Sequence, residues 1–324
     1  SYGIAESFDL IVPRMFGGSS GSEKLPEESH VVEFLQTQQV GEGQYISKEQ
    51  AIEFASQGMP VYWGDQPIVA APAYIGAAVF FLFVLGMFSE KRKIKYAFLA
   101  GAIVSLLLSW GKHFPLLTDL FINYFPMYNK FRAVASIQVI LELCMPALAM
   151  MGLYSFMKEE DEKLKVKQLT YSAGISVGLM VVLLLCKGMF SFTGAADQMY
   201  AQSYGQEFIR ALQEDRKDLY SADLLRSAFL MLAVAATLYF YARKKLSSNA
   251  AVILAGLIMV FDLFFIDKNY VDASAFTIAH KVDQPFERTM ADEQILKDTT
   301  YYRVFEVNGN LNSARASYFH KSIG

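Results

Sequence analysis

The chain has 324 residues, of which 53% are hydrophobic and 19% are charged, and its mean hydropathy is +0.26. A soluble domain of this size carries about a quarter charged residues, so the composition favours a membrane protein. The net charge of −3 gives no support to a nucleic-acid-binding protein, and two cysteines inside apolar runs, Cys144 and Cys186, exclude a disulfide framework.

Residues 1–65 contain ten acidic and three basic residues and no apolar run long enough to cross a bilayer. Ser47 and Gln50 have the spacing of a capping box, which predicts a short helix that runs through Ala55 and ends before Pro60. We expect 1–65 to be an extracytoplasmic loop region.

Six long stretches with few charges follow, and each is predicted to be a membrane-spanning helix of about 20 residues. They make 66–266 a six-helix transmembrane region: 66–89, 96–111, 133–157, 168–186, 224–242 and 246–266. Between the second and third stretches, 116–124 is amphipathic and too short to cross, so we expect it to lie along the interface. The polar connection 188–222 is predicted to carry a separate helix near 207–219.

The loops 90–95, 158–167 and 243–248 hold four, four and three Lys or Arg residues. With six crossings they fall on one side, which the positive-inside rule makes cytoplasmic. The N-terminal region, the loops 112–132 and 188–222 and the tail then face outward.

The tail, 267–324, has the composition of a soluble domain. We predict a helix over 287–297 and a strand over 301–307, where apolar residues alternate. One helix and one strand cannot bury a core, so the tail is expected to open a larger extracytoplasmic α+β domain. The fold class predicted is therefore all-α in the membrane, and the chain is expected to be an internal piece of a longer protein.

Charged residues inside predicted spans are candidates for function because burying them in lipid costs free energy. Glu142 follows Gln138 by one helical turn, and Asp262 lies near the outward end of the sixth span. Packing between helices explains both residues equally well. Arg226 lies close to a span end, where its side chain is expected to reach the interface.

The outward ends of the spans bring together a carboxylate and several cations. Asp65 precedes the first span, Lys112 follows the second, and Lys130 and Arg132 precede the third. Cations at this depth suit a lipid phosphate, and Asp65 beside them can act as a general base. Anchoring at the interface is the alternative explanation. The histidines and cysteines lack zinc-type spacing, and we predict neither a metal nor a cofactor.

Four motifs resemble those of the YfhO family of bacterial membrane proteins, in the form found in Bacteroidetes. They are Tyr62-Trp63-Gly64-Asp65-Gln66-Pro67, Leu108-Ser109-Trp110-Gly111-Lys112, Pro126-Met127-Tyr128-Asn129-Lys130-Phe131-Arg132-Ala133 and Ser317-Tyr318-Phe319-His320-Lys321-Ser322-Ile323-Gly324. The resemblance implies a GT-C-like glycosyltransferase bundle that takes sugars from polyprenyl-phosphate donors on the outer face of the cytoplasmic membrane.

The same resemblance implies membrane lipid, a lipid-linked sugar donor and an envelope glycan or protein acceptor as partners, and no nucleic acid. On this reading Lys112, Lys130 and Arg132 are our candidates for contacting the donor phosphate, and Asp65 is a secondary candidate for acid–base chemistry or for acceptor binding. The main catalytic carboxylate of such enzymes lies in their first outward loop, which is expected to precede Ser1. Two alternatives remain open at this point: a transporter for a lipid-linked substrate, with Glu142 and Asp262 along its path, and a scaffold for envelope assembly.

Overall fold

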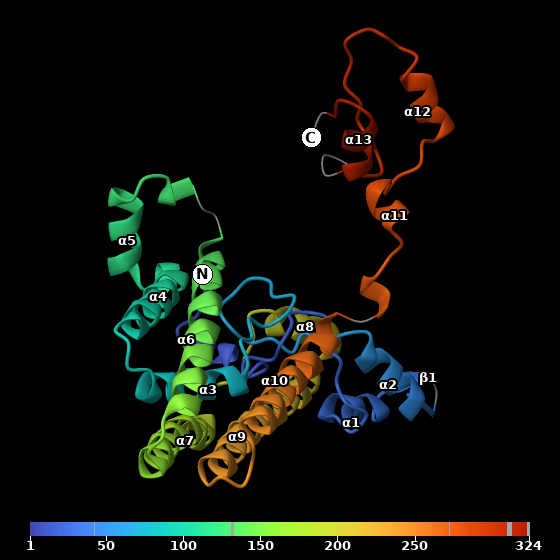
Figure 1. Cartoon of the computed structure of the whole chain (residues 1–324). Coiled ribbons are helices and arrows are strands. Elements are labelled where there is room, and N and C mark those ends of the chain that lie inside the picture. The colour runs from blue at the N-terminus through green and yellow to red at the C-terminus, as the bar shows by residue number, and fades with distance from the viewer. Residues whose placement is uncertain (42, 131–132, 272, 310–312, 323–324) are drawn as a thin grey trace. The chain divides into compact units, whose positions relative to one another are not determined.

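The computed structural model describes the chain apart from residues 42, 131–132, 272, 310–312 and 323–324 (Figure 1). The described residues form two compact units, 1–270 and 271–324. The first unit contains a short antiparallel hairpin, β1 (Gln39–Gly41) and β2 (Gln44–Tyr45). Its helices are α1 (His30–Gln36), α2 (Lys48–Ser56), α3 (Ala77–Ser89), α4 (Ile94–Ser109), α5 (Pro115–Tyr124), α6 (Gln138–Lys158), α7 (Glu162–Leu185), α8 (Asp197–Tyr204), α9 (Gln206–Ala242) and α10 (Ser248–Tyr270).

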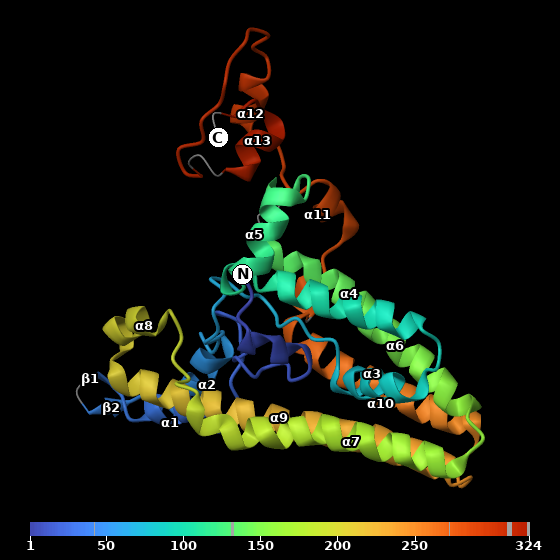
Figure 2. The same ribbon diagram turned by 90° about the vertical axis from the view of Figure 1, so that its left-hand side faces the viewer.

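Among the residues that the structure describes, four helical segments are long and apolar enough to cross a membrane: 134–158, 162–189, 206–242 and 248–270. The apolar helices α3 and α4 are shorter, with 13 and 16 residues. In Figure 2 the long helices of the first unit run side by side. Large apolar side chains such as Phe229 and Ile253 are exposed on this bundle, as expected where helices face lipid. The chain is a mostly helical protein of the membrane type.

The predicted first span differs from the structure. A helix was expected from residue 66, but α3 begins at Ala77, and the preceding residues are irregular. Pro67 and Pro72 disfavour a helix there, and backbone groups of the segment bond elsewhere instead. Val69 N donates to Ser20 Oγ (2.8 Å), and Ile75 N donates to Leu10 O (3.0 Å). Residues 66–76 therefore tie the N-terminal segment to the bundle.

The helix predicted near 207–219 and the fifth span are one helix, not two. α9 contains 37 residues and neither Gly nor Pro, and it extends for about 55 Å. Its N-terminal half packs with α1, α2 and α8 in a second hydrophobic core that includes Val32, Ala51 and Leu212. The short helix predicted after Ser47 is confirmed: α2 begins at Lys48 behind a complete capping box.

The second unit contains α11 (Ala279–Asp283), α12 (Met290–Ile295) and α13 (Ala314–Phe319). α12 begins later than predicted because Thr289 and Asp292 form a capping box at its start. The strand predicted over 301–307 is wrong. Its described residues make one isolated bridge, between Val304 and Ser322, because no neighbouring strand pairs with them.

Helices α3 and α6 pack closely through small residues. A Cβ atom built on Gly152 would lie 2.2 Å from Gly86 Cα, so the two backbones leave no room for a side chain. Ser89 Oγ donates across the same contact to Gly152 O (2.8 Å). The absence of a Cβ at both glycines thus sets the distance between these helices.

We expect Gly152→Ala to lower the free energy of unfolding by about 1–3 kcal/mol, because α3 and α6 must separate to fit a methyl group. Thermal unfolding of the purified protein in detergent measures the change. Gly178→Ala in α7 is the matched control, since nothing lies within 4 Å of its built Cβ. Equal losses in the two variants would contradict the tight α3–α6 contact.

Candidate functional site

The first ten residues are fixed across one end of the bundle. Tyr2 N donates to Ser109 O at the end of α4 (3.1 Å), and Trp110 Nε1 donates to Ser7 Oγ (2.7 Å). Residues Ala5–Leu10 form a 3₁₀ helix, η1. Bonds from the C-terminal end of α4 therefore hold this N-terminal segment in place.

Helix η1 carries two buried carboxylates, Glu6 and Asp9, which are 1% and 5% exposed. Glu6 accepts hydrogen bonds from Gly3 N and from the Tyr62 hydroxyl. Asp9 accepts from Phe16 N (3.2 Å). Each buried carboxylate thus holds one neighbouring segment against η1.

Burial of Asp9, together with the nearby charge of Glu6, raises its pKa well above the usual range of an aspartic acid. Burial and the hydrogen bond to Glu6 raise the pKa of Tyr62 as well, so its hydroxyl stays protonated and remains a donor. Burial thus favours the neutral, protonated forms of both Asp9 and Tyr62.

The Tyr62 hydroxyl also shapes the loop that carries Asp65. It accepts a hydrogen bond from Gln66 N (2.9 Å) while it donates to Glu6. Asp65 is exposed, and a Cβ built on Gly3 would lie 2.6 Å from its Oδ2 atom. Asp65 is thus accessible and is positioned next to Gly3 by the contact between Tyr62 and Glu6.

Lys112 borders the same N-terminal segment. Its backbone N donates to Ser1 Oγ (3.2 Å), and its neighbour His113 places Nδ1 2.8 Å from Tyr2 O. The Lys112 side chain is exposed. The structure therefore brings two of the predicted site residues, Asp65 and Lys112, to the stretch 1–3.

Lys130, the other predicted cation that the structure describes, forms no hydrogen bond or ion pair with the residues around Asp65. Lys130 is exposed on a short 3₁₀ helix, Tyr128–Lys130, and its side chain has no polar partner among the residues described. Arg132 lies outside the described residues. Val134 lies close to the residue that precedes Lys112: its Cγ1 atom is 3.6 Å from a Cβ built on Gly111.

An apolar cavity of about 230 Å³ lies against η1. Its wall includes Ser7 and Phe8, which lie between Glu6 and Asp9 in sequence. The rest of the lining comes from α3, α4, α6, α7 and the end of η1: Leu10, Ile11, Phe80, Phe83, Leu99, Ala102, Ile103, Leu106, Leu141, Met145 and Leu179. Helix η1 thus separates an apolar space from an acidic group of side chains.

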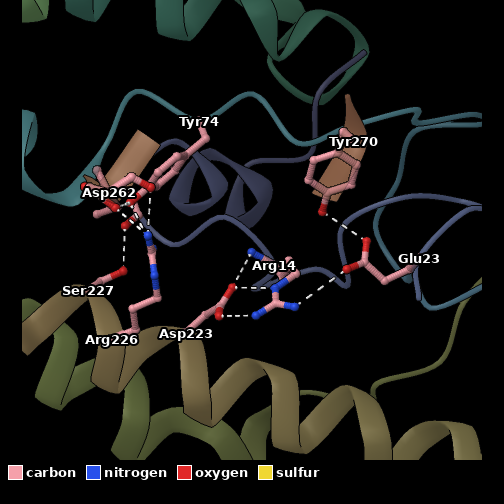
Figure 3. Close-up of polar contacts among 9 residues, drawn as sticks. Arg14, Glu23, Tyr74, Asp223, Arg226, Ser227, Asp262 and Tyr270 are labelled. Atoms are coloured by element: carbon pink, nitrogen blue, oxygen red, sulfur yellow. Dashed lines mark hydrogen bonds and ion pairs between the residues drawn. The ribbon is translucent and has the colours of Figure 1, made fainter. Parts of the chain in front are cut away.

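Asp262 occupies a closed polar network (Figure 3). Its carboxylate accepts from Arg226 Nη2 (2.8 Å), from the Tyr74 hydroxyl (2.6 Å) and from Ala78 N (3.2 Å). Ala78 lies in the first turn of α3, whose own N-cap residue, Gly76, has no side chain to offer. Asp262 therefore caps α3 from another helix. Arg226 was expected to reach the interface, but it is paired with Asp262 instead.

A second network lies beside it on α9 (Figure 3). The guanidinium of Arg14 binds both carboxylate oxygens of Asp223 (3.0 and 2.7 Å) and lies 3.7 Å from Glu23. The hydroxyl of Tyr270, the last residue of α10, donates to Glu23 (3.0 Å). These bonds join the N-terminal segment to α9 and α10.

Glu142 is exposed on α6. Gln138, predicted on the same face, is buried, and its Nε2 donates to Ser109 Oγ (3.4 Å). Burial and the nearby acidic groups of the N-terminal segment raise the pKa of the Tyr2 hydroxyl. The charge of Glu142 makes a smaller contribution in the same direction.

Sequence reasoning missed Glu6 and Asp9, and it named Tyr62 only as part of the motif that carries Asp65. It counted the acidic residues of the N-terminal region without asking which of them lie among apolar neighbours. Glu6 and Asp9 are three residues apart within a largely apolar stretch, 2–16, and that pattern is the signal for buried carboxylates on one helix face.

Comparisons of the chain with protein-family models, with curated proteins and with solved structures find no match.

We expect Asp262→Asn to cost about 3–5 kcal/mol of stability, because it leaves the partly buried Arg226 without its counter-charge. Thermal unfolding in detergent reports this loss. Asp267→Asn, an exposed position on the same helix, is the control and should change stability by less than about 0.5 kcal/mol. Similar melting of the two variants would show that the network does not hold α3.

Proposed function

We propose that the chain is part of a membrane glycosyltransferase that uses a polyprenyl-phosphate-linked sugar in cell-envelope glycan modification. The observation that supports this most is an apolar cavity lined in part by Ser7 and Phe8 of η1. The same N-terminal segment meets Asp65 and Lys112 at residues 1–3. A lipid-linked sugar combines an apolar chain, a phosphate and a hydroxylated ring, and these surroundings suit each part.

In the proposed reaction, part of the lipid chain occupies the cavity and the donor phosphate lies toward Lys112. Lys130 and Arg132 remain predicted contacts of the same phosphate. Asp65 accepts the proton of an acceptor hydroxyl, whose oxygen attacks the anomeric carbon as the bond to the phosphate oxygen breaks. The phosphate leaves with the bonding electron pair, and the configuration at the anomeric carbon inverts. Glu6 and Tyr62 position the loop that carries Asp65.

The placement in the membrane is part of the proposal. Counting α3 and α4 with the four long segments gives six crossings. The loops 90–95, 158–167 and 243–248 lie together, since Lys91 pairs with Glu159 and Arg243 pairs with Glu162 (both 2.7 Å). We assign this end to the cytoplasm of a bacterium and the N-terminal region, 188–222 and the tail to the outer side of its cytoplasmic membrane.

The two alternatives have less support from the geometry. A transport path past Glu142 and Asp262 requires both carboxylates to meet the substrate, but Asp262 is 0% exposed and already bound to Arg226 and Tyr74. A passive scaffold does not require an apolar cavity beside buried acids. The transferase uses both features.

Asp65→Asn should reduce sugar transfer by the full-length protein at least about 100-fold, because an amide cannot accept the proton. The assay uses purified protein and labelled polyprenyl-phosphate sugars. Glu53→Gln, which changes an exposed carboxylate on α2, is the control and should keep full activity. Normal transfer by Asp65→Asn, with an unchanged melting temperature, would remove Asp65 from the mechanism.

The orientation is tested by cysteine labelling in intact cells. After both native cysteines are replaced by serine, Ser203→Cys on α8 should react with a membrane-impermeant maleimide. Lys91→Cys, exposed in the first basic loop, should react only after the cells are opened. Labelling of Lys91→Cys in intact cells would reverse the proposed orientation.

A further inference from the structure

One end of the first unit combines an excess of positive charge with exposed aromatic rings. We call it the basic belt: the loops 90–95, 158–167 and 243–248 with the flanking rings of Tyr96, Tyr154, Tyr171, Tyr239 and Phe240. The loops contain eleven Lys or Arg residues and five Asp or Glu residues. Ion pairs between the loops show that they form one surface.

The aromatic rings of the belt are between 38% and 59% exposed, and each has a cation over its face. The distances from cation to ring centroid are 5.4 Å for Lys95 and Tyr96, 5.7 Å for Lys158 and Tyr154, 5.7 Å for Lys167 and Tyr171, 5.5 Å for Arg243 and Tyr239, and 6.0 Å for Lys245 and Phe240. Rings of this kind, beside exposed aliphatic residues such as Ile175 and Ile253, are typical of side chains at headgroup depth.

The carboxylates of the belt leave several of its cations unpaired. Arg92 binds Glu90 and lowers the pKa of its carboxyl group to about 2. Burial opposes this shift but does not cancel it. Among the described residues Lys93, Lys244 and Lys245 are exposed and form no ion pair. These three cations are available to anions outside the chain.

We propose that the basic belt binds the headgroups of anionic phospholipids, with phosphates at Lys93, Lys244 and Lys245. This inference concerns the end of the bundle away from η1 and does not depend on the transferase reaction. Charge complementarity favours an anionic headgroup, and the exposed rings and apolar side chains favour a lipid over a soluble anion. The belt then selects the lipids next to the bundle.

The test uses the full chain in a neutral detergent, titrated with phosphatidylglycerol, with phosphatidylcholine or with inorganic phosphate. Thermal unfolding and native mass spectrometry report binding. Phosphatidylglycerol should raise the melting temperature and remain bound, and the effect should weaken at high salt. Phosphatidylcholine and inorganic phosphate should have little effect.

The triple variant Lys93→Gln/Lys244→Gln/Lys245→Gln should bind phosphatidylglycerol about 100-fold more weakly, since each charge near a membrane surface contributes about a fivefold factor. Its melting temperature without lipid should not change, because all three side chains are exposed. The control Lys48→Gln/Lys281→Gln/Lys297→Gln removes the same charge from exposed positions elsewhere.

Three results would overturn the proposal. Equal stabilisation by phosphatidylcholine would show that the charge of the headgroup is irrelevant. Equal stabilisation by inorganic phosphate would assign the cations to a soluble anion. An equal loss of affinity in the control variant would trace the effect to net charge rather than to the belt.

Discussion

The carboxylate of Asp262 fixes the start of α3, and much of the first unit depends on that position. α3 follows eleven residues of irregular backbone and has Gly76 at its N-cap, so its first turn has no local side chain to satisfy its free N–H groups. Asp262, supplied by α10, meets that need, and Arg226 from α9 balances its charge. One carboxylate thus sets the relation of three helices. From its fixed start α3 reaches the glycine contact with α6 and forms part of the cavity wall beside η1.

Helix α9 connects this region to the peripheral core through charged residues that face inward. Arg216 is fully buried and binds both oxygens of Asp197 (2.7 and 2.8 Å) as well as the carbonyls of Pro60, Val61 and Phe192. Asp215 accepts from the first two N–H groups of α1. Guanidinium groups suit such positions because their planar set of donors can satisfy several acceptors at once. The irregular segments around α9 are therefore held by side chains of this helix, and not by regular pairing of their own.

Most of the long apolar helices could be predicted from the sequence, because long uncharged stretches indicate such helices directly. Helices α6, α7 and α10 cover most of the spans predicted for them, and their ends differ from the predicted ends by one to six residues. The start of α3 could not be predicted, because it depends on Asp262, almost two hundred residues away. The unbroken α9 was missed, since its polar half was predicted to be a separate helix within the connection 188–222. The strand at 301–307 was predicted from alternation alone, but a strand also needs a partner.

Of the candidate site, Asp65 and Lys112 could be named as neighbours of the bundle end, whereas the acids that organise it are buried in a segment predicted to be a loop.

The buried acids of η1 are best understood through the energetics of their surroundings. Placing Glu6 and Asp9 close together away from water costs free energy, and the raised pKa of Asp9 expresses that cost. Hydrogen bonds from Gly3, Tyr62 and Phe16 offset part of it, and each of these bonds fixes a segment that has no regular secondary structure. The result is an ordered loop in which Asp65 is exposed next to Gly3. An acid that only orders a loop can equally lie at an exposed N-cap, where the cost is small. Burial instead provides an environment in which charged groups interact most strongly, and this is the physical basis for the proposal that the chemistry takes place near η1.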